Sequence, residues 1–132
     1  MDISSRVKEL NLPVGSYAVF GSGPLAARGI RSTDGIDIIV TRKLFRELAA
    51  DKSWEAVELR DLHSSLKRGE VEIFHTWGPG SWDIDSLIKD ADIIDGVPYV
   101  ELRSVLEWKH LRDSAKDRHD IMLIQKYLAE HQ

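Results

Sequence analysis

The sequence contains no cysteine, no long apolar run and no excess of basic residues. Without cysteine, disulfide bridges and thiolate metal sites are excluded. The apolar runs are far shorter than the roughly 20 residues of a membrane-spanning helix. The polar start MDISSRVKEL also lacks the apolar segment of a secretory signal peptide. We therefore expect a cytoplasmic protein with no membrane span.

Charge and length narrow the range of functions further. The formal net charge is −4 at pH 7, whereas proteins that bind nucleic acid over a broad surface gain most of their affinity by neutralising phosphates. A broad nucleic-acid-binding surface is therefore excluded, but a small basic pocket for a nucleotide is not. A length of 132 residues suits one domain with its own hydrophobic core, and no repeat or linker divides residues 1–132.

Short apolar runs alternate with amphipathic segments along the chain. The β-branched and aromatic runs predict strands, at residues 16–20, 36–40, 54–60, 70–77 and 97–100. Helical periodicity predicts helices, at residues 3–10, 24–30, 43–51, 82–92, 100–111 and 117–131. The polar segment 61–69 is expected to be a loop, and Ser114 to cap the last helix together with Asp117. The predicted fold class is α/β (α+β), with a small mixed β-sheet flanked by helices and a C-terminal helical pair.

One segment, YAVFGSGPLAARGIRSTDGIDIIVT, carries most of the chemical information. A strand ends at Gly21 and Ser22, a short helix follows, and two aspartates, Asp34 and Asp37, stand at the opening of a second strand. Backbone N–H groups at such a turn can bind a triphosphate, and carboxylates on the neighbouring strand can hold Mg²⁺ beside it. The turn alone is a weak signal, but the later acidic strand EVEIF makes the combination more specific.

Four segments together resemble the DNA polymerase β-like nucleotidyltransferase superfamily, in particular its small bacterial single-domain members of the toxin- and antitoxin-associated type. They are GSGPLAARGIR, IDIIVT, EVEIF and LEWKHLRDSAKDRHDIMLI, and the resemblance extends over residues 17–128. It implies a nucleotidyltransferase fold and the Mg²⁺-dependent transfer of a nucleoside monophosphate from an NTP to an acceptor hydroxyl, with pyrophosphate leaving. The acceptor is unidentified; a protein or an RNA end is among the candidates.

The resemblance also implies roles for individual residues. Gly21 and Ser22 match the motif that contacts the triphosphate, although Ser22 is also a plausible helix cap. Asp37 matches the second aspartate of an Asp-x-Asp pair. Glu72 matches the third carboxylate, which binds the metal and helps to deprotonate the acceptor hydroxyl, and Glu70 is its rival on the same strand face.

Two basic residues are further candidates for nucleotide binding, and each has two readings. Lys109 would reach the phosphates or attach the C-terminal tail to the sheet, unless it is only a lysine at the edge of the core. Arg31 would steer the phosphates or pair with Asp34. The residues alone do not decide between these alternatives.

Gly35 stands where the first aspartate of the Asp-x-Asp pair would be. Side chains alternate along a strand, so Asp34, three residues before Asp37, would point to the opposite face of a regular strand. In one account Gly35 forms a bulge that turns Asp34 back toward Asp37, and Asp34, Asp37 and Glu72 form a catalytic metal site. In the other, the first ligand is lost and the protein is a catalytically impaired nucleotide-binding or interaction module.

Overall fold

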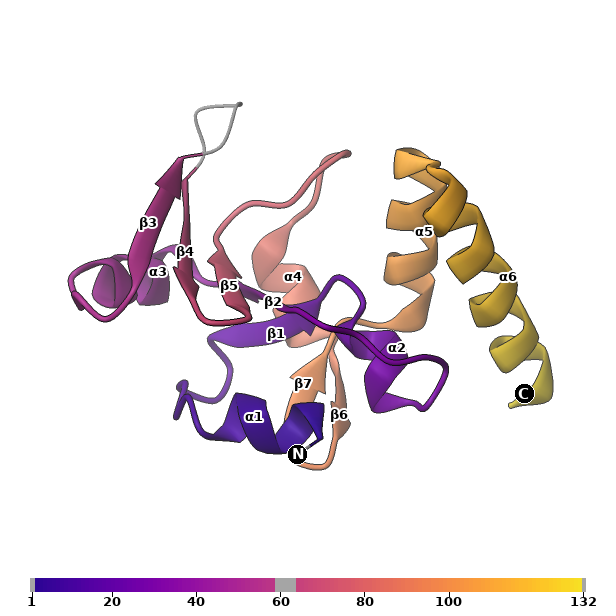
Figure 1. Cartoon of the computed structure of the whole chain (residues 1–132), viewed down its shortest axis with the longest axis horizontal. Coiled ribbons are helices and arrows are strands. Elements are labelled where there is room, and N and C mark those ends of the chain that lie inside the picture. Colours follow the sequence, from indigo (N-terminus) through magenta and orange to yellow (C-terminus); the bar gives the residue numbers. More distant parts are fainter. Residues whose placement is uncertain (1, 59–63, 132) are drawn as a thin grey trace.

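The computed structural model describes residues 2–58 and 64–131. Within these residues, seven strands form one mixed sheet in the order β3-β4-β5-β2-β1-β7-β6 (Figure 1). The pairs β2–β5 and β1–β7 are parallel, and the other neighbouring strands are antiparallel. The strands are β1 (Tyr17–Phe20), β2 (Ile36–Val40), β3 (Glu55–Glu58), β4 (Ser64–Arg68), β5 (Val71–Phe74), β6 (Asp92–Ile94) and β7 (Val97–Tyr99).

Six helices accompany the sheet in the described part of the chain. They are α1 (Ile3–Lys8), α2 (Gly23–Ala27), α3 (Arg42–Ala49), α4 (Ile84–Lys89), α5 (Leu102–Arg112) and α6 (Ala115–Glu130). Pro24 lies in the first turn of α2, where its missing N–H is not needed. At the start of α6, the Ser114 hydroxyl accepts a hydrogen bond from the Asp117 N–H, and the Asp117 carboxylate accepts one from the Ser114 N–H. This capping box confirms the predicted cap of the last helix.

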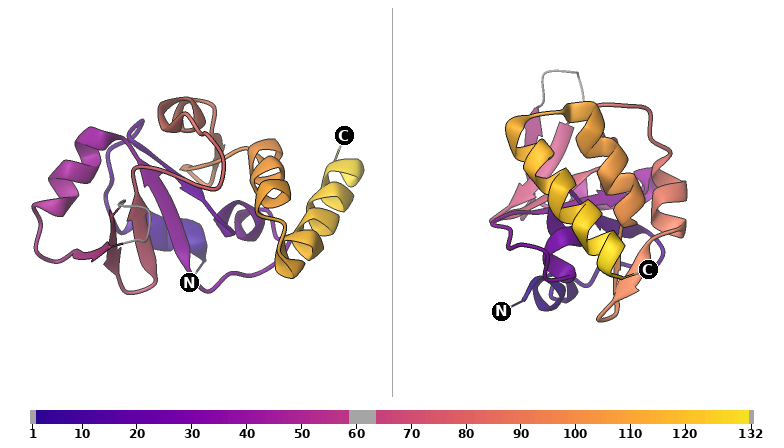
Figure 2. Two further views of the ribbon diagram at one scale, coloured as in Figure 1. Left: turned by 90° about the horizontal axis from the view of Figure 1, so that it is seen from above. Right: turned by 90° about the vertical axis from the view of Figure 1, so that its right-hand side faces the viewer.

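Both faces of the sheet are covered, which explains why its central strands are almost continuously apolar. Tyr17 and Val19 of β1 belong to a core that includes side chains of α1 and α3. Ala18 and Phe20, which alternate with them, belong to a second core that includes α4, α5 and α6. Helices α5 and α6 lie side by side at one end of the molecule, and α3 lies at the other end (Figure 1, Figure 2). The predicted C-terminal helical pair is thus confirmed.

Strand β4 lies in the polar segment that was expected to be a loop. It pairs with β3 on one side and β5 on the other, and its neighbouring residues Ser65 and Leu66 are both buried. The loop prediction is wrong for these residues because a polar strand with two adjacent buried positions shows no alternation of apolar and polar residues. Residues 59 and 60 of the predicted strand 54–60 and residues 61–63 of the predicted loop 61–69 lie outside the described residues.

Strand β6 begins at Asp92, where the predicted helix 82–92 was expected to end. Helix α4 already ends at Lys89. Asp95 and Gly96 both have positive φ values, 52° and 79°, as two-residue hairpin turns require. This turn folds β6 back onto β7, so the helix prediction is wrong for the last residues of that segment.

Candidate active site

Asp37 and Glu72 are direct neighbours on two adjacent strands. Strands β2 and β5 run parallel, and Asp37 stands opposite Glu72 in their register. Strand alternation places both side chains on the sheet face that α5 and α6 cover. The rival Glu70 instead forms a salt bridge with Arg6, at 2.8 Å. The structure therefore brings together the two carboxylates that the resemblance had selected.

The surroundings of this pair disfavour two negative charges. Burial and the nearby charge of Glu72 raise the pKa of Asp37 to about 6, although Arg112 and Lys67 act in the opposite direction. The Ser65 hydroxyl donates a hydrogen bond of 2.6 Å to Oε2 of Glu72 and so orients that carboxylate. A cation placed between the two carboxylates would relieve their repulsion.

Gly21 allows the Asp37 carboxylate to come close to the turn after β1. Its φ is +63°, and a Cβ added there would lie 2.7 Å from Oδ2 of Asp37. Both the backbone conformation and the contact thus require glycine. Ser22 holds the cap position of α2, but its hydroxyl accepts a hydrogen bond of 2.7 Å from Nη2 of Arg31.

Arg31 pairs with Asp120 of α6 and not with Asp34. Its Nε and Nη2 donate hydrogen bonds of 2.6 and 2.8 Å to the two carboxylate oxygens of Asp120. Burial raises the pKa of Asp120, but its contacts with Arg31 and Lys109 outweigh that effect, and the pKa is lowered. Arg31 therefore links the Ser22 turn to the last helix.

Lys109 is fully buried between the last two helices, with an exposed fraction of 0%. Its Nζ lies 2.9 Å from Oδ2 of Asp120 and 3.6 Å from Oδ1 of Asp117. Of the two roles considered for this residue, its position supports attachment of the C-terminal tail. In this arrangement a bound phosphate would have no access to Lys109.

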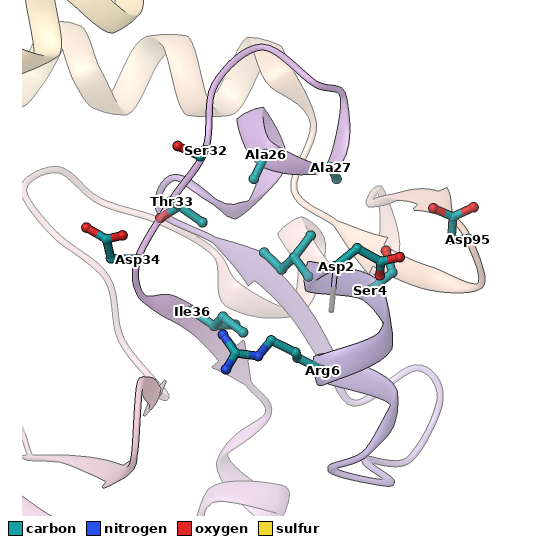
Figure 3. Close-up of a pocket in the computed structure, with 11 residues that line it drawn as sticks. Asp2, Ser4, Arg6, Ala26, Ala27, Ser32, Thr33, Asp34, Ile36 and Asp95 are labelled. Atoms are coloured by element: carbon teal, nitrogen blue, oxygen red, sulfur yellow. The ribbon is translucent and has the colours of Figure 1, made fainter.

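Asp34 is exposed and lies at a bend before β2. It borders a small pocket on the α1 side of this segment, and Figure 3 shows its carboxylate apart from the side chains of Arg6 and Asp2 in that pocket. Gly35 does not have positive φ, and β2 pairs with β5 residue for residue from Ile36 onward. The strand pairings thus do not show the bulge that one account of Gly35 required.

Two pockets meet at Asp37. One is polar, with a volume of about 300 Å³, and the other is aromatic, with a volume of about 730 Å³. Asp37, Trp108 and Arg112 line both of them. The other residues around the polar pocket are Gly21, Ser22, Arg31, Ser32, Thr33, Asp34, Gly35 and Lys116. The other residues around the aromatic pocket are Glu72, Phe74, Thr76, Trp77, Gly78, Pro79 and Gly80.

Sequence reasoning missed Arg112 and Trp108 as residues of this site. The guanidinium of Arg112 lies 4.1 Å from the centre of the Trp108 ring and donates hydrogen bonds of 2.8 and 2.6 Å to the carboxylate of Asp117. The predicted helix ended at residue 111, one residue before Arg112, whereas α5 continues to Arg112 and so places it on the same helix face as Trp108, four residues earlier. Trp77 also lines the aromatic pocket, and its ring stacks on that of Phe20 with 4.6 Å between the ring centroids.

No protein-family model and no curated protein matches the sequence. The structure is similar to a crystal structure of ANT(2″)-Ia in complex with adenylyl-2″-tobramycin, with a TM-score of 0.56 and 19% identity, covering 98% of this chain and 88% of that chain. ANT(2″)-Ia is an aminoglycoside nucleotidyltransferase. At this identity the similarity shows the fold. The chain therefore has a nucleotidyltransferase fold, while membership of the DNA polymerase β-like superfamily and the toxin- or antitoxin-associated type stay predictions. None of the described helices is both long and apolar enough to cross a membrane.

Proposed function

We propose that the protein binds an NTP with Mg²⁺ and transfers its nucleoside monophosphate to an acceptor hydroxyl. The observation that carries this proposal is the pairing of Asp37 with Glu72 on adjacent parallel strands of a nucleotidyltransferase fold. Asp37 also borders the same polar pocket as Gly21, Ser22 and Arg31. One small cavity thus has around it a candidate metal ligand and three residues proposed to contact the phosphates, which supports the proposal.

The residues around Asp37 suit Mg²⁺, which takes part of its ligands from water and substrate phosphates, better than they suit a metal held entirely by protein side chains. Among the described residues, no group of three or more His, Cys, Asp or Glu side chains is placed to hold a metal ion. Mg²⁺ keeps several waters and is commonly held by one or two carboxylates together with substrate phosphates. Asp37, which lines both pockets, and Glu72, which lines the aromatic pocket, would be these carboxylates, and Asp34, at the rim of the polar pocket, is the third candidate. Bound Mg²⁺ would polarise the phosphoryl oxygens and neutralise developing charge.

The chain's own groups supply the remaining steps of the transfer. Glu72 accepts the proton of the acceptor hydroxyl. The acceptor oxygen then forms a bond to the α-phosphorus, and the bond from that phosphorus to the bridging oxygen breaks. The electron pair leaves with pyrophosphate, whose charge Arg31 and Ser22 stabilise in the polar pocket. A protein or RNA end remains a candidate acceptor, and the adenylyl-2″-tobramycin bound to ANT(2″)-Ia adds small hydroxyl compounds as candidates.

A second function is favoured by Gly35 and by the exposed position of Asp34. A site with only Asp37 and Glu72 would bind Mg²⁺ and nucleotide more weakly, because a hard cation loses affinity with each missing carboxylate. The chain would then be a nucleotide-binding or interaction module without transferase activity. The two functions share the nucleotide site and differ in chemistry.

The experiment separates the two functions in two steps. Thermal shifts are first measured with ATP, GTP, CTP and UTP, each with Mg²⁺, because a ligand of the native state raises the melting temperature. Release of pyrophosphate and transfer of label from α-labelled NTP are then measured with protein, RNA and aminoglycoside acceptors. Transfer that is lost in Glu72→Gln supports the enzyme, and binding without transfer supports the module. If no NTP shifts the melting temperature, both functions are wrong.

A further inference from the structure

Helix α6 presents two buried aspartates, and each holds one arginine at the polar pocket. Asp117 and Asp120 are three residues apart and therefore lie on one helix face. Their exposed fractions are 0% and 1%. Asp117 accepts two hydrogen bonds from Arg112, and Asp120 accepts two from Arg31. The C-terminal pair of helices thus fixes the position of two guanidinium groups.

The buried charges leave this cluster positive on the side of the pocket. Lys109 contacts both aspartates from inside the protein, so its charge already offsets one of the two carboxylates. The remaining carboxylate balances only one of the two guanidinium groups. One positive charge is therefore left over. Among the other residues that line the polar pocket, Lys116 adds a positive charge, and Asp34 and Asp37 are the carboxylates proposed to hold Mg²⁺. The cluster is suited to an anionic ligand although the chain as a whole has a net charge of −4.

The two arginines occupy different places around the site. Arg31 lines only the polar pocket of the two that meet at Asp37, and its Nη1 donates to the carbonyl of Ser32. Arg112 lines both pockets and is close enough to Asp37 to act on its charge. The side chain of Arg112 is 41% exposed, and its bonds to Asp117 come from Nε and Nη2. Its Nη1 is therefore the nitrogen left to meet a ligand at the junction of the pockets.

We infer that Arg112 binds the phosphate that is transferred, and that Asp117 is the positioning residue that holds Arg112 there. This inference rests on the proposed function. We place the acceptor in the aromatic pocket, opposite the pyrophosphate in the polar pocket. In an in-line displacement the reacting phosphate lies between the two, and so at the junction of the pockets next to Asp37. A fixed guanidinium at that point stabilises the charge that develops on the non-bridging oxygens. Stacking on Trp108 and bonding to Asp117 fix Arg112 before the ligand arrives.

The test compares ligands that carry different numbers of phosphates. Affinities for adenosine, AMP, pyrophosphate and ATP are measured with Mg²⁺ by titration calorimetry for the parent, Arg112→Met and Arg112→Lys. Arg118→Met is the matched control, because Arg118 also pairs with an aspartate, Asp113, but is exposed and lines neither pocket. Arg112→Met should lose about tenfold or more in affinity for AMP and ATP and nothing for adenosine. Arg112→Lys should recover part of the loss, and Arg118→Met should match the parent.

Asp117→Asn tests the positioning role in the same titrations. The substitution removes the charge of the group that accepts both hydrogen bonds from Arg112, so Arg112 should become mobile. The affinity for AMP should then fall, and the affinity for adenosine should stay unchanged. A general loosening of the fold would lower both affinities. If Asp117→Asn does not fold, the two Arg112 variants still decide the inference. An Arg112→Met protein that binds AMP like the parent overturns it and leaves the proposed function standing. A parent that binds no nucleotide overturns both.

Discussion

The Asp37 carboxylate fills the space into which any side chain at residue 21 would extend. An added Cβ on Gly21 would lie 2.7 Å from Oδ2 and 3.2 Å from Cβ of Asp37, and the φ of Gly21 is +63°. The turn after β1 and the candidate metal-binding carboxylate of β2 are therefore matched to each other. The glycine that the turn requires for its positive φ is thus also required by the position of the Asp37 carboxylate.

Gly21→Ala should damage the fold and the site together. The left-handed backbone costs about 1 kcal/mol for a residue with a Cβ, and the contact with Asp37 adds to that cost by forcing the carboxylate to move. We expect a lower melting temperature and a weaker Mg²⁺-dependent shift with ATP. Gly29→Ala is the control, since Gly29 also has positive φ but a Cβ there meets nothing within 4 Å. Equal losses of the Mg²⁺-dependent shift in the two variants would contradict the role of the Gly21–Asp37 contact.

Asp37→Asn should stabilise the metal-free protein at alkaline pH. The folded pKa of Asp37 is raised from 3.8 to about 6, so the folded state binds its proton more tightly than the unfolded state. The parent therefore loses stability as pH rises from about 4 to 6, and the amide does not. Each unit of pKa shift corresponds to about 1.4 kcal/mol, so a gain of about 1–3 kcal/mol is expected at pH 8, with little difference near pH 4.

Urea unfolding in the presence of a chelator, at a series of pH values, measures this difference. Asp90→Asn, at an exposed site after α4, serves as the control. Adding Mg²⁺ should then stabilise the parent and have a smaller effect on Asp37→Asn. A constant difference between parent and variant over the whole pH range would show that the Asp37 carboxyl is not the titrating group.

Lys109→Met should destabilise the C-terminal helices strongly. The substitution leaves Asp117 and Asp120 in a buried place with one cation fewer, and breaking such a buried ion cluster typically costs about 3–5 kcal/mol. Calorimetric melting compares it with Lys126→Met, which removes an exposed lysine of α6. Unchanged stability and unchanged ATP affinity in Lys109→Met would mean that the lysine only fills space at the edge of the core.

The sequence predicts this site best where local backbone chemistry decides the structure. The Gly21–Ser22 turn and the two strands that carry Asp37 and Glu72 follow from glycine, proline and short apolar runs, but the parallel pairing of those strands was not predicted. Attachment of the C-terminal tail was one of the readings considered for Lys109, but the complete burial of this lysine does not follow from helical periodicity.

The partners of Arg31 and Arg112 could not be predicted in the same way. Arg31 pairs with Asp120, which lies 89 residues further along the chain, and Asp34 was the obvious local alternative. Arg112 stands at the end of α5, in a polar stretch that is typical of a helix break. Only the packing of α6 against α5 makes these residues part of one cluster, and no short-range pattern contains that information.

Gly35→Asp tests whether the lost carboxylate can be rebuilt. Gly35 does not have positive φ, and a Cβ there would lie 3.7 Å from the carbonyl oxygen of Glu70, an ordinary contact. The hydrogen bond from the Ile36 N–H to that carbonyl continues the pairing with the chain before β5. A side chain at residue 35 is therefore accepted without backbone strain, and a position two residues before Asp37 faces the same side as Asp37 in extended chain.

We expect Gly35→Asp to raise Mg²⁺ affinity about tenfold and to increase nucleotidyl transfer, or to create it, because a third carboxylate joins Asp37 and Glu72. Gly35→Asn controls for size, since it adds the same shape without the charge and should leave Mg²⁺ affinity near that of the parent. The companion variant is Asp34→Ala, which should have a small effect if Asp34 is only at the rim of the pocket. Calorimetric titration with Mg²⁺ at saturating ATP, followed by pyrophosphate release, measures all three variants. The opposite result would be a parent with robust nucleotidyl transfer that Asp34→Ala abolishes and Gly35→Asp lowers. It would show that Asp34 is a metal ligand and that Gly35 is needed to bring Asp34 to the metal site.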